Sequence, residues 1–263
     1  MTDERDKLRA VAKYEFMKHL RRKRFYVVLA LAIAVEMIVL IALPLLGAGY
    51  PSNVMTMAAL LSMGATFPTM GAVFFAGDAI AGEFEGKTGY VLFPNPVRRS
   101  TIVLGKYLAC FSAIALVVLA LYGVVGASLL WIYRRVPVEV AGSMALCLLA
   151  SGAVVAVTFF FSSISRGAMG ATVTTLIFIF VVLSVVESVL LMAGQPRWFL
   201  LSYASDVVVT IYNGYGAFAG VREGMPSGAM RSPDVGTSVA VMVAYLVVFL
   251  ALSVAITRRR EMT

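Results

Sequence analysis

The sequence predicts an all-helical integral membrane protein with six transmembrane helices. Of its 263 residues, 60% are hydrophobic and only 14% are charged, whereas soluble domains carry about 25% charged residues. The mean hydropathy is +0.90. Six mostly apolar stretches reach the length of about 20 residues that a helix needs to cross the hydrocarbon core of a bilayer. We expect these spans at approximately residues 25–46, 54–77, 107–133, 140–161, 169–193 and 235–256, which together make a transmembrane domain over residues 25–256.

The distribution of Lys and Arg predicts that both termini lie in the cytoplasm. With a cytoplasmic amino terminus, seventeen Lys and Arg fall on the inner side (nine before residue 25, four at 78–106, Arg166 and three in the tail at 257–263), against five on the outer side. This agrees with the positive-inside rule. The net charge of +8 therefore suits lipid headgroups, and we expect no nucleic-acid partner.

The leader at residues 1–24 is predicted to be an amphipathic helix on the inner membrane surface. Its apolar side chains recur near one helical face, and they are Leu8, Val11, Ala12, Phe16 and Leu20. Lys and Arg occupy much of the remaining surface, which is typical of helices that bind lipid headgroups. A solvated basic leader is the alternative. His19 has no Cys or second His near it in the sequence, so we expect no metal site.

The segment at residues 194–234 is predicted to lie at the outer membrane interface. It is too long for a simple turn, and it combines Gly and Pro with four aromatic residues, Trp198, Tyr203, Tyr212 and Tyr215. Because aromatic side chains are enriched at membrane interfaces, we expect short helices here and no seventh crossing.

The hairpin at residues 78–106, between the second and third spans, is predicted to carry a short charged helix. Glu83 and Lys87 have the favourable i, i+4 spacing and order of a helical ion pair. Asn95 is a good helix cap and Pro96 a good first helical residue, so a second helix should start there and lead into the third span. The hairpin would then present an ordered, charged element on the cytoplasmic side.

Gly86, Lys87 and Thr88 have the order that closes a phosphate-binding loop, but we expect no nucleotide site. That loop needs G-x-x-x-x-G-K-[ST] between a strand and a helix. Here Ala81 stands at the position of the first Gly, and a membrane span precedes it. The sequence also lacks the G-x-S-x-G and H-E-x-x-H motifs of hydrolases. We therefore expect no enzymatic centre in this chain.

The same hairpin matches a family pattern close to I-A-G-E-x-E-x-G-T, followed by P-V-S-R and then G-K. The matching residues are Ile80, Ala81, Gly82, Glu83, Glu85, Thr88, Pro96, Val97, Arg99, Gly105 and Lys106. Lys87 stands where the family has Gly, and Arg98 where it has Ser. At these residues the sequence resembles the permease subunits of the ABC-2 type transporter family. The six spans, the basic leader and the long outer loop extend the resemblance along the chain.

The resemblance implies that the hairpin contains a coupling helix, which docks on a separate ABC ATPase (nucleotide-binding) subunit. The residues expected to serve this coupling are Asp78, Glu83, Glu85, Lys87, Thr88, Pro96, Arg99 and Lys106. Glu83 and Glu85 would meet basic groups of the ATPase. Arg98, Arg99 and Lys106 would anchor the hairpin to lipid headgroups. The alternative is that these charged residues only belong to a solvent-exposed cytoplasmic loop with no coupling role.

The resemblance also implies an exporter of the prokaryotic cell membrane, built from two copies of this chain or from this chain and a paralogue. The chain would form the translocation path and bind no cofactor itself, because ATP and Mg would be held by the ATPase subunit. Membrane lipids would be its other partners.

Two acidic residues fall within the predicted spans, Glu36 in the first and Glu187 in the fifth. Placing a charge at the centre of a span costs about 2.5–3.5 kcal/mol, so each is a candidate for the transport path or is held by hydrogen bonds to hydroxyl groups. The alternative function is an ion-coupled secondary transporter that uses both carboxylates. Such carriers have repeated halves and broken helices, and neither is evident in this sequence.

Pro68 and two glycines are expected to shape the bundle. Pro68 lies within the second span, where a proline removes one backbone hydrogen bond and kinks the helix. Gly123 and Gly126 lie in the third span, where small residues permit close helix contact.

Overall fold

The computed structural model describes residues 4–47, 49–86, 98–212 and 233–259, and within these ranges the chain forms helices and no strand. Six helices are long and apolar enough to cross a membrane, which confirms the predicted number of spans. The helices of these spans are α2 (Lys23–Leu45), α3 (Val54–Ser62) with α4 (Thr66–Ala76) and α5 (Ala81–Glu85), α7 (Arg99–Tyr133), α8 (Glu139–Ile164), α9 (Ala168–Leu176) with α10 (Leu183–Met192), and α14 (Val235–Arg259).

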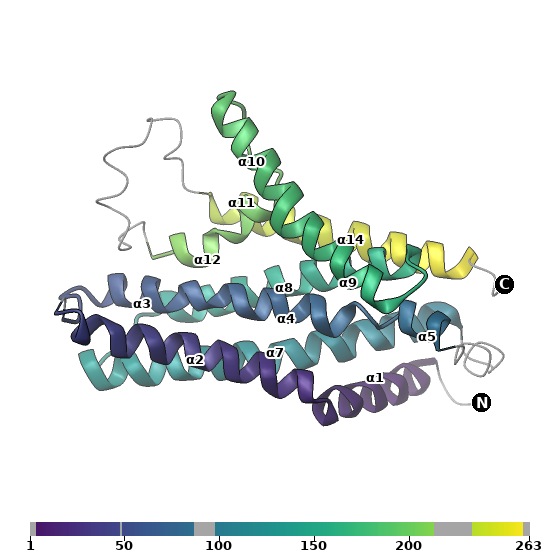
Figure 1. Cartoon of the computed structure of the whole chain (residues 1–263), viewed down its shortest axis with the longest axis horizontal. Coiled ribbons are helices and arrows are strands. Elements are labelled where there is room, and N and C mark those ends of the chain that lie inside the picture. The colour runs from purple at the N-terminus through teal and green to yellow at the C-terminus, as the bar shows by residue number, and fades with distance from the viewer. Residues whose placement is uncertain (1–3, 48, 87–97, 213–232, 260–263) are drawn as a thin grey trace.

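Most spans lie side by side in an elongated bundle, and α8 contacts α4, α7, α9 and α14 (Figure 1). The start of α1 (Glu4–Arg21), the short helix α5 and the end of α14 lie at the same end of the bundle, while α10 diverges from it (Figure 1). An even number of spans predicts that the two ends of the chain share a side. The structure therefore brings the hairpin region and both terminal helices together.

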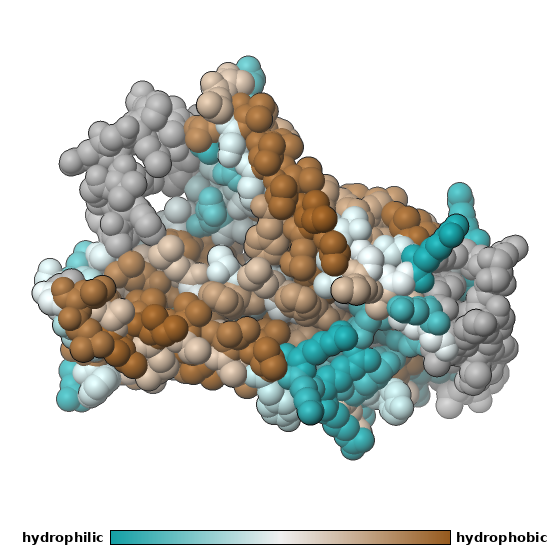
Figure 2. Space-filling view, in the orientation of Figure 1, coloured by the Kyte–Doolittle hydropathy of each residue, from teal (hydrophilic) through white to brown (hydrophobic). Residues whose placement is uncertain are grey.

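The leader helix α1 packs against protein along its apolar face. That face lies along the first turns of α7, where Gly105 lets the two helices approach closely, because a Cβ at this position would lie 2.7 Å from Val11 Cγ1. Leu8, Val11 and Phe16 are half-buried. The side of α1 that was expected to face lipid therefore packs against α7. Hydrophilic residues cover the outward side of α1 beside the apolar band of the bundle (Figure 2).

Two spans are interrupted within the bundle. A 3₁₀ segment at Met63–Ala65, labelled η1, separates α3 from α4, one turn before Pro68. Proline has no N–H and its ring crowds the carbonyl four residues earlier, here that of Gly64. The 3₁₀ segment therefore lies one turn before the proline at which the sequence predicts a kink. A π-helical segment, η2 (Ile177–Val182), interrupts the fifth span. The chain stays helical through this segment, from Ala168 to Met192.

Close helix contacts depend on other glycines than those expected. Among the described residues of this chain, a Cβ at Gly123 or Gly126 would meet nothing within 4 Å. In contrast, a Cβ at Gly64 would lie 2.3 Å from Glu36 Oε1, and one at Gly71 would lie 2.5 Å from Val28 Cγ1. These two glycines let the second span approach α2.

The interfacial segment contains short helices as expected, whereas the start of the third span differs from the expectation. The helices α11 (Leu201–Ser205) and α12 (Val207–Thr210) are the short helices that the structure describes after the fifth span. The third span was expected to grow from a helix starting at Asn95 and Pro96. Arg98 instead has an extended backbone and caps α7, which begins at Arg99. Residues 87–97 and 213–232 lie outside the described ranges.

Candidate functional site

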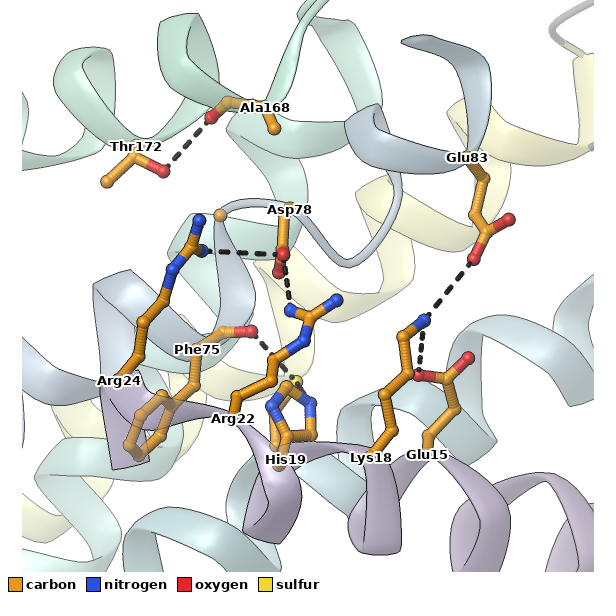
Figure 3. Close-up of polar contacts among 12 residues, drawn as sticks. Glu15, Lys18, His19, Arg22, Arg24, Phe75, Asp78, Glu83, Ala168 and Thr172 are labelled. Atoms are coloured by element: carbon orange, nitrogen blue, oxygen red, sulfur yellow. Dashed lines mark hydrogen bonds and ion pairs between the residues drawn. The ribbon is translucent and has the colours of Figure 1, made fainter. Parts of the chain in front are cut away.

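Charged side chains gather around α5 and the turn before it, at the end of the bundle where α1 begins and α14 ends (Figure 3). We call this group the α5 cluster, and it consists of Glu15, Lys18, Arg22, Arg24, Asp78, Glu83 and Lys106. Two come from α1, one lies between α1 and α2, one comes from the start of α2, two from the second span and one from α7. The cluster therefore connects segments that lie far apart in the sequence.

Lys106 is the buried centre of the α5 cluster. Its Nζ donates hydrogen bonds to Glu15 Oε1 at 2.9 Å and to Glu83 Oε1 at 2.8 Å, and the residue is only 4% exposed. A buried ammonium is tolerated when it is paired and hydrogen-bonded. Lys106 was expected at the lipid headgroups, and the structure places it inside the protein instead. Glu83 was expected to face basic groups of an ATPase subunit, and its carboxylate instead accepts a hydrogen bond from Lys106.

Asp78 fixes the junction between α1 and α2 to the end of the second span. Its carboxylate accepts hydrogen bonds from the guanidinium groups of Arg22 and Arg24, the latter at 3.4 Å. Arg22 is the residue between the two helices, since α1 ends at Arg21 and α2 begins at Lys23. Figure 3 shows Asp78 between these two arginines.

The helix α5 is also attached to α8 and α9. Ser162 Oγ, on α8, accepts hydrogen bonds from the backbone N–H groups of Ile80 at 3.2 Å and Ala81 at 2.9 Å, and it donates to the Gly77 carbonyl at 2.9 Å. Glu85 Oε2 accepts from the Ala168 N–H at 2.8 Å, at the start of α9. A carboxylate at a helix N-terminus is favourable, because it satisfies a free N–H and interacts with the helix dipole.

The start of α7 is held by two further contacts. Arg99 donates hydrogen bonds to the backbone carbonyls of Thr257 and Arg258 at 3.4 Å each, near the end of α14. Basic side chains at a helix C-terminus stabilise it, because they donate to carbonyls that have no donor within the helix. Thr101 donates to Glu4 Oε2 at 2.9 Å. Arg99 was expected to reach lipid headgroups, and the structure places its guanidinium on α14.

Burial and charge shift two titratable groups of α1. Burial lowers the pKa of His19 to about 4, and its Nε2 lies 3.3 Å from Cys110 Sγ on α7. Burial would raise the pKa of Glu15, but the Lys106 ammonium, with help from Lys18, holds it below the usual range. The docked α1 therefore contains a neutral imidazole and an ionised carboxylate.

The structure brings together only some of the residues expected to serve coupling. Asp78, Glu83 and Lys106 meet in the α5 cluster, while Glu85 and Arg99 contact α9 and α14. Lys87, Thr88 and Pro96 lie outside the described residues.

The sequence reasoning missed the contributions of α1 and of Ser162 to this site. One signal was available, because Glu15 and His19 interrupt the apolar face of α1 at helical spacing. Within the described ranges, no three His, Cys, Asp or Glu side chains are grouped so that they could hold a metal ion. The contacts observed in the α5 cluster are ion pairs.

The two intramembrane carboxylates differ in their surroundings. Glu187 Oε1 lies 3.6 Å from Arg197 Nη1, and Glu187 Oε2 accepts a hydrogen bond from Ser202 at 2.7 Å. Arg197 also stacks over the Tyr203 ring at 4.9 Å from the ring centroid. Glu36 is 1% exposed, and neither of its carboxyl oxygens has a hydrogen-bond partner among the described residues.

Comparison with known proteins identifies one family. The sequence model of a family described as "Protein of unknown function (DUF2705)" matches residues 27–263. A search of curated proteins finds no match. The matched region contains α5, α7, α8 and α9 but not α1, so the part of the α5 cluster that α1 contributes lies before it.

Proposed function

The chain belongs to the DUF2705 family of proteins of unknown function, and we propose that it is the transmembrane permease subunit of an ATP-binding cassette exporter. In this proposal the six spans form the translocation path together with a second permease subunit. A separate ATPase subunit binds ATP and Mg, and it docks at the hairpin that contains α5. Movement of α5 then changes the packing of the spans.

The observation that carries this proposal is the attachment of α5 to several helices at once. Glu83 bonds to Lys106 on α7, Glu85 to the start of α9, and Ser162 on α8 bonds to the start of α5. Through Lys106, the same contacts reach Glu15 on α1. Helix α5 has only five residues, so these contacts hold it as one body with the helices around it. A force applied at α5 would therefore reach three spans, because packed and bonded elements move together.

The contacts suggest a division of roles among the coupling residues. Asp78, Glu83 and Lys106 are engaged within the chain, so their role in the proposal is to transmit movement. Glu85 is exposed although it bonds to Ala168, and it is the described carboxylate of α5 that a docked subunit could still reach. The outward basic side of α1 would contact anionic lipid headgroups.

One observation favours a second candidate, an ion-coupled carrier. The second span is broken beside a buried Glu36, and broken spans beside carboxylates are typical of such carriers. Glu187, the other carboxylate that this candidate would use, is paired with Arg197. The two candidates differ in energy source, because the carrier would need a proton or Na⁺ gradient and no ATP.

The first experiment tests the energy source. The full chain is purified from its native membranes in mild detergent, and the eluate is assayed for vanadate-sensitive ATP hydrolysis and for ATP photolabelling of a co-purifying subunit. We expect a labelled ATPase subunit in a fixed ratio to the chain. Purification of the chain alone, with substrate movement in proteoliposomes that follows an imposed ion gradient without ATP, would support the carrier instead.

The second experiment tests transmission through α5. Glu83→Gln keeps the size of the side chain but removes its charge opposite Lys106. We expect the variant to retain the ATPase subunit while transport per ATP hydrolysed falls several-fold. Asp6→Asn, at an exposed position of α1, is the matched control and should behave as the wild type. Unchanged coupling in Glu83→Gln would contradict the role assigned to α5.

A further inference from the structure

The carboxyl group of Glu36 lies in an apolar environment inside the transmembrane bundle. The buried residues of α2 are Phe25, Val28, Ala32 and Glu36, whose spacing of three and four residues forms one stripe facing the other spans. Glu36 thus occupies a position where the pattern calls for an apolar side chain. At 1% exposure and with neither oxygen hydrogen-bonded within the described chain, an ionised carboxylate here would have neither water nor a counter-charge.

A gap in the second span makes room for this carboxyl group. Gly64, in the 3₁₀ segment η1, faces it so closely that a Cβ would lie 2.3 Å from Glu36 Oε1 and 3.3 Å from Glu36 Cδ. Leu121 on α7 is the other close neighbour of this position, its Cδ1 lying 3.6 Å from where that Cβ would be. The space that the absent glycine side chain leaves is therefore filled by the Glu36 carboxyl group.

The groups that face Glu36 from the surrounding helices do not include a charge. Among the described residues of α3, η1, α4 and α7, no charged side chain acts on it. The titratable neighbour beyond η1 is Tyr212, whose hydroxyl is 2.8 Å from Ser62 Oγ. Burial raises the pKa of Tyr212, although hydrogen bonds with Ser143 and Ser62 oppose this shift. Because the only charged form of a phenol is an anion, Tyr212 offers no compensating charge to a carboxylate.

From this geometry we infer that Glu36 is a proton-binding site of the transmembrane domain, occupied when α2 is packed against η1. Loss of the proton would leave a bare charge against Leu121 and the glycine gap, which is costly in a medium without water. The charged form therefore favours separation of α2 from the second span, where water can reach the carboxylate. Proton occupancy and the packing of α2 are linked, whatever energy source drives transport.

The test measures the protonated carboxyl group directly. The full chain is placed in lipid nanodiscs, and the infrared C=O stretch of neutral carboxylic acids is recorded across a pH series, with selective ¹³C labelling of glutamate to identify the residue type in the wild type. We expect a glutamate band at neutral pH that is absent in Glu36→Gln and retained in Glu187→Gln. A wild-type spectrum identical to that of Glu36→Gln would overturn the inference.

A second measurement links the proton to packing. Hydrogen exchange of the segment that contains Met63–Ala65 should increase in the wild type as the pH rises and the band disappears. Glu36→Gln is an isosteric neutral replacement. In this variant the exchange rate of the segment, corrected for the intrinsic pH dependence of amide exchange, should stay constant over the same pH range. An increase of equal size in both proteins would show that Glu36 does not control the contact, and it would contradict the proposal even if the band assignment held.

Discussion

Glu83 and Glu36 are both carboxylates of membrane-spanning segments, yet their surroundings are opposite. Glu83, at the end of the second span, accepts a hydrogen bond from Lys106 at 2.8 Å and has Lys18 at 4.0 Å. Glu36, near the middle of the first span, has no such partner among the described residues. The α5 cluster stabilises charge by pairing, whereas the bundle interior excludes charge. The comparison teaches that an acidic residue in a membrane protein must be interpreted from its neighbours and not from its depth alone.

The largest effect is expected from removing the cation of the α5 cluster. Lys106→Met would leave the buried Glu15 and the half-buried Glu83 without their main partner, and breaking a buried pair in this way costs about 3–5 kcal/mol. The matched control is Lys18→Met, because the Lys18 side chain is 38% exposed and exposed pairs contribute about 0–1 kcal/mol. Thermal unfolding in detergent measures both variants. Equal stability of the two would refute the central role of Lys106.

The pH dependence of α1 docking provides the next test. His19 is neutral when docked, with its pKa lowered to about 4 by burial, but it ionises near pH 6.5 once exposed. Docking stability is therefore complete above about pH 6.5 and decreases as the pH falls toward 4, by about 2 kcal/mol at pH 5. The lowered pKa of Glu15 acts in the same direction at still lower pH.

Hydrogen exchange of α1, corrected for the intrinsic rate, measures this loss between pH 7 and pH 5. His19→Gln should remove most of the pH dependence in that window. If protection of α1 decreased equally in the variant, another group would be responsible.

The next test concerns the close contact between Gly64 and Glu36 in the bundle interior. Gly64→Ala places a Cβ against Glu36 Oε1 and should cost about 1–3 kcal/mol of stability through overpacking. Combining it with Glu36→Ala should restore most of the loss, because the clashing carboxyl group is then absent. Gly123→Ala, whose Cβ meets nothing within 4 Å, should be neutral or stabilising by up to about 1 kcal/mol. Strictly additive effects of Gly64→Ala and Glu36→Ala would contradict the contact.

The smallest effect is expected at the edge of the α5 cluster. Glu85→Gln removes the charge that lies at the start of α9, and the residue is exposed, so the loss should be about 0.3–1 kcal/mol. The measurement is hydrogen exchange of the first turn of α9, with Asp6→Asn as the unaffected control. A loss as large as that of Lys106→Met would mean that the attachment of α5 to α9 dominates the cluster.

The sequence by itself determined the all-helical fold and its six spans, because apolar length and helical spacing are local properties of the chain. Only the tertiary structure decided where the charges go. Lys106 is 91 residues from Glu15, and no spacing rule connects positions so far apart. The same holds for Glu36 and Gly64, which meet because two spans pack side by side. Ion pairs and buried gaps depend on which helices become neighbours, and that depends on the packing of the whole bundle.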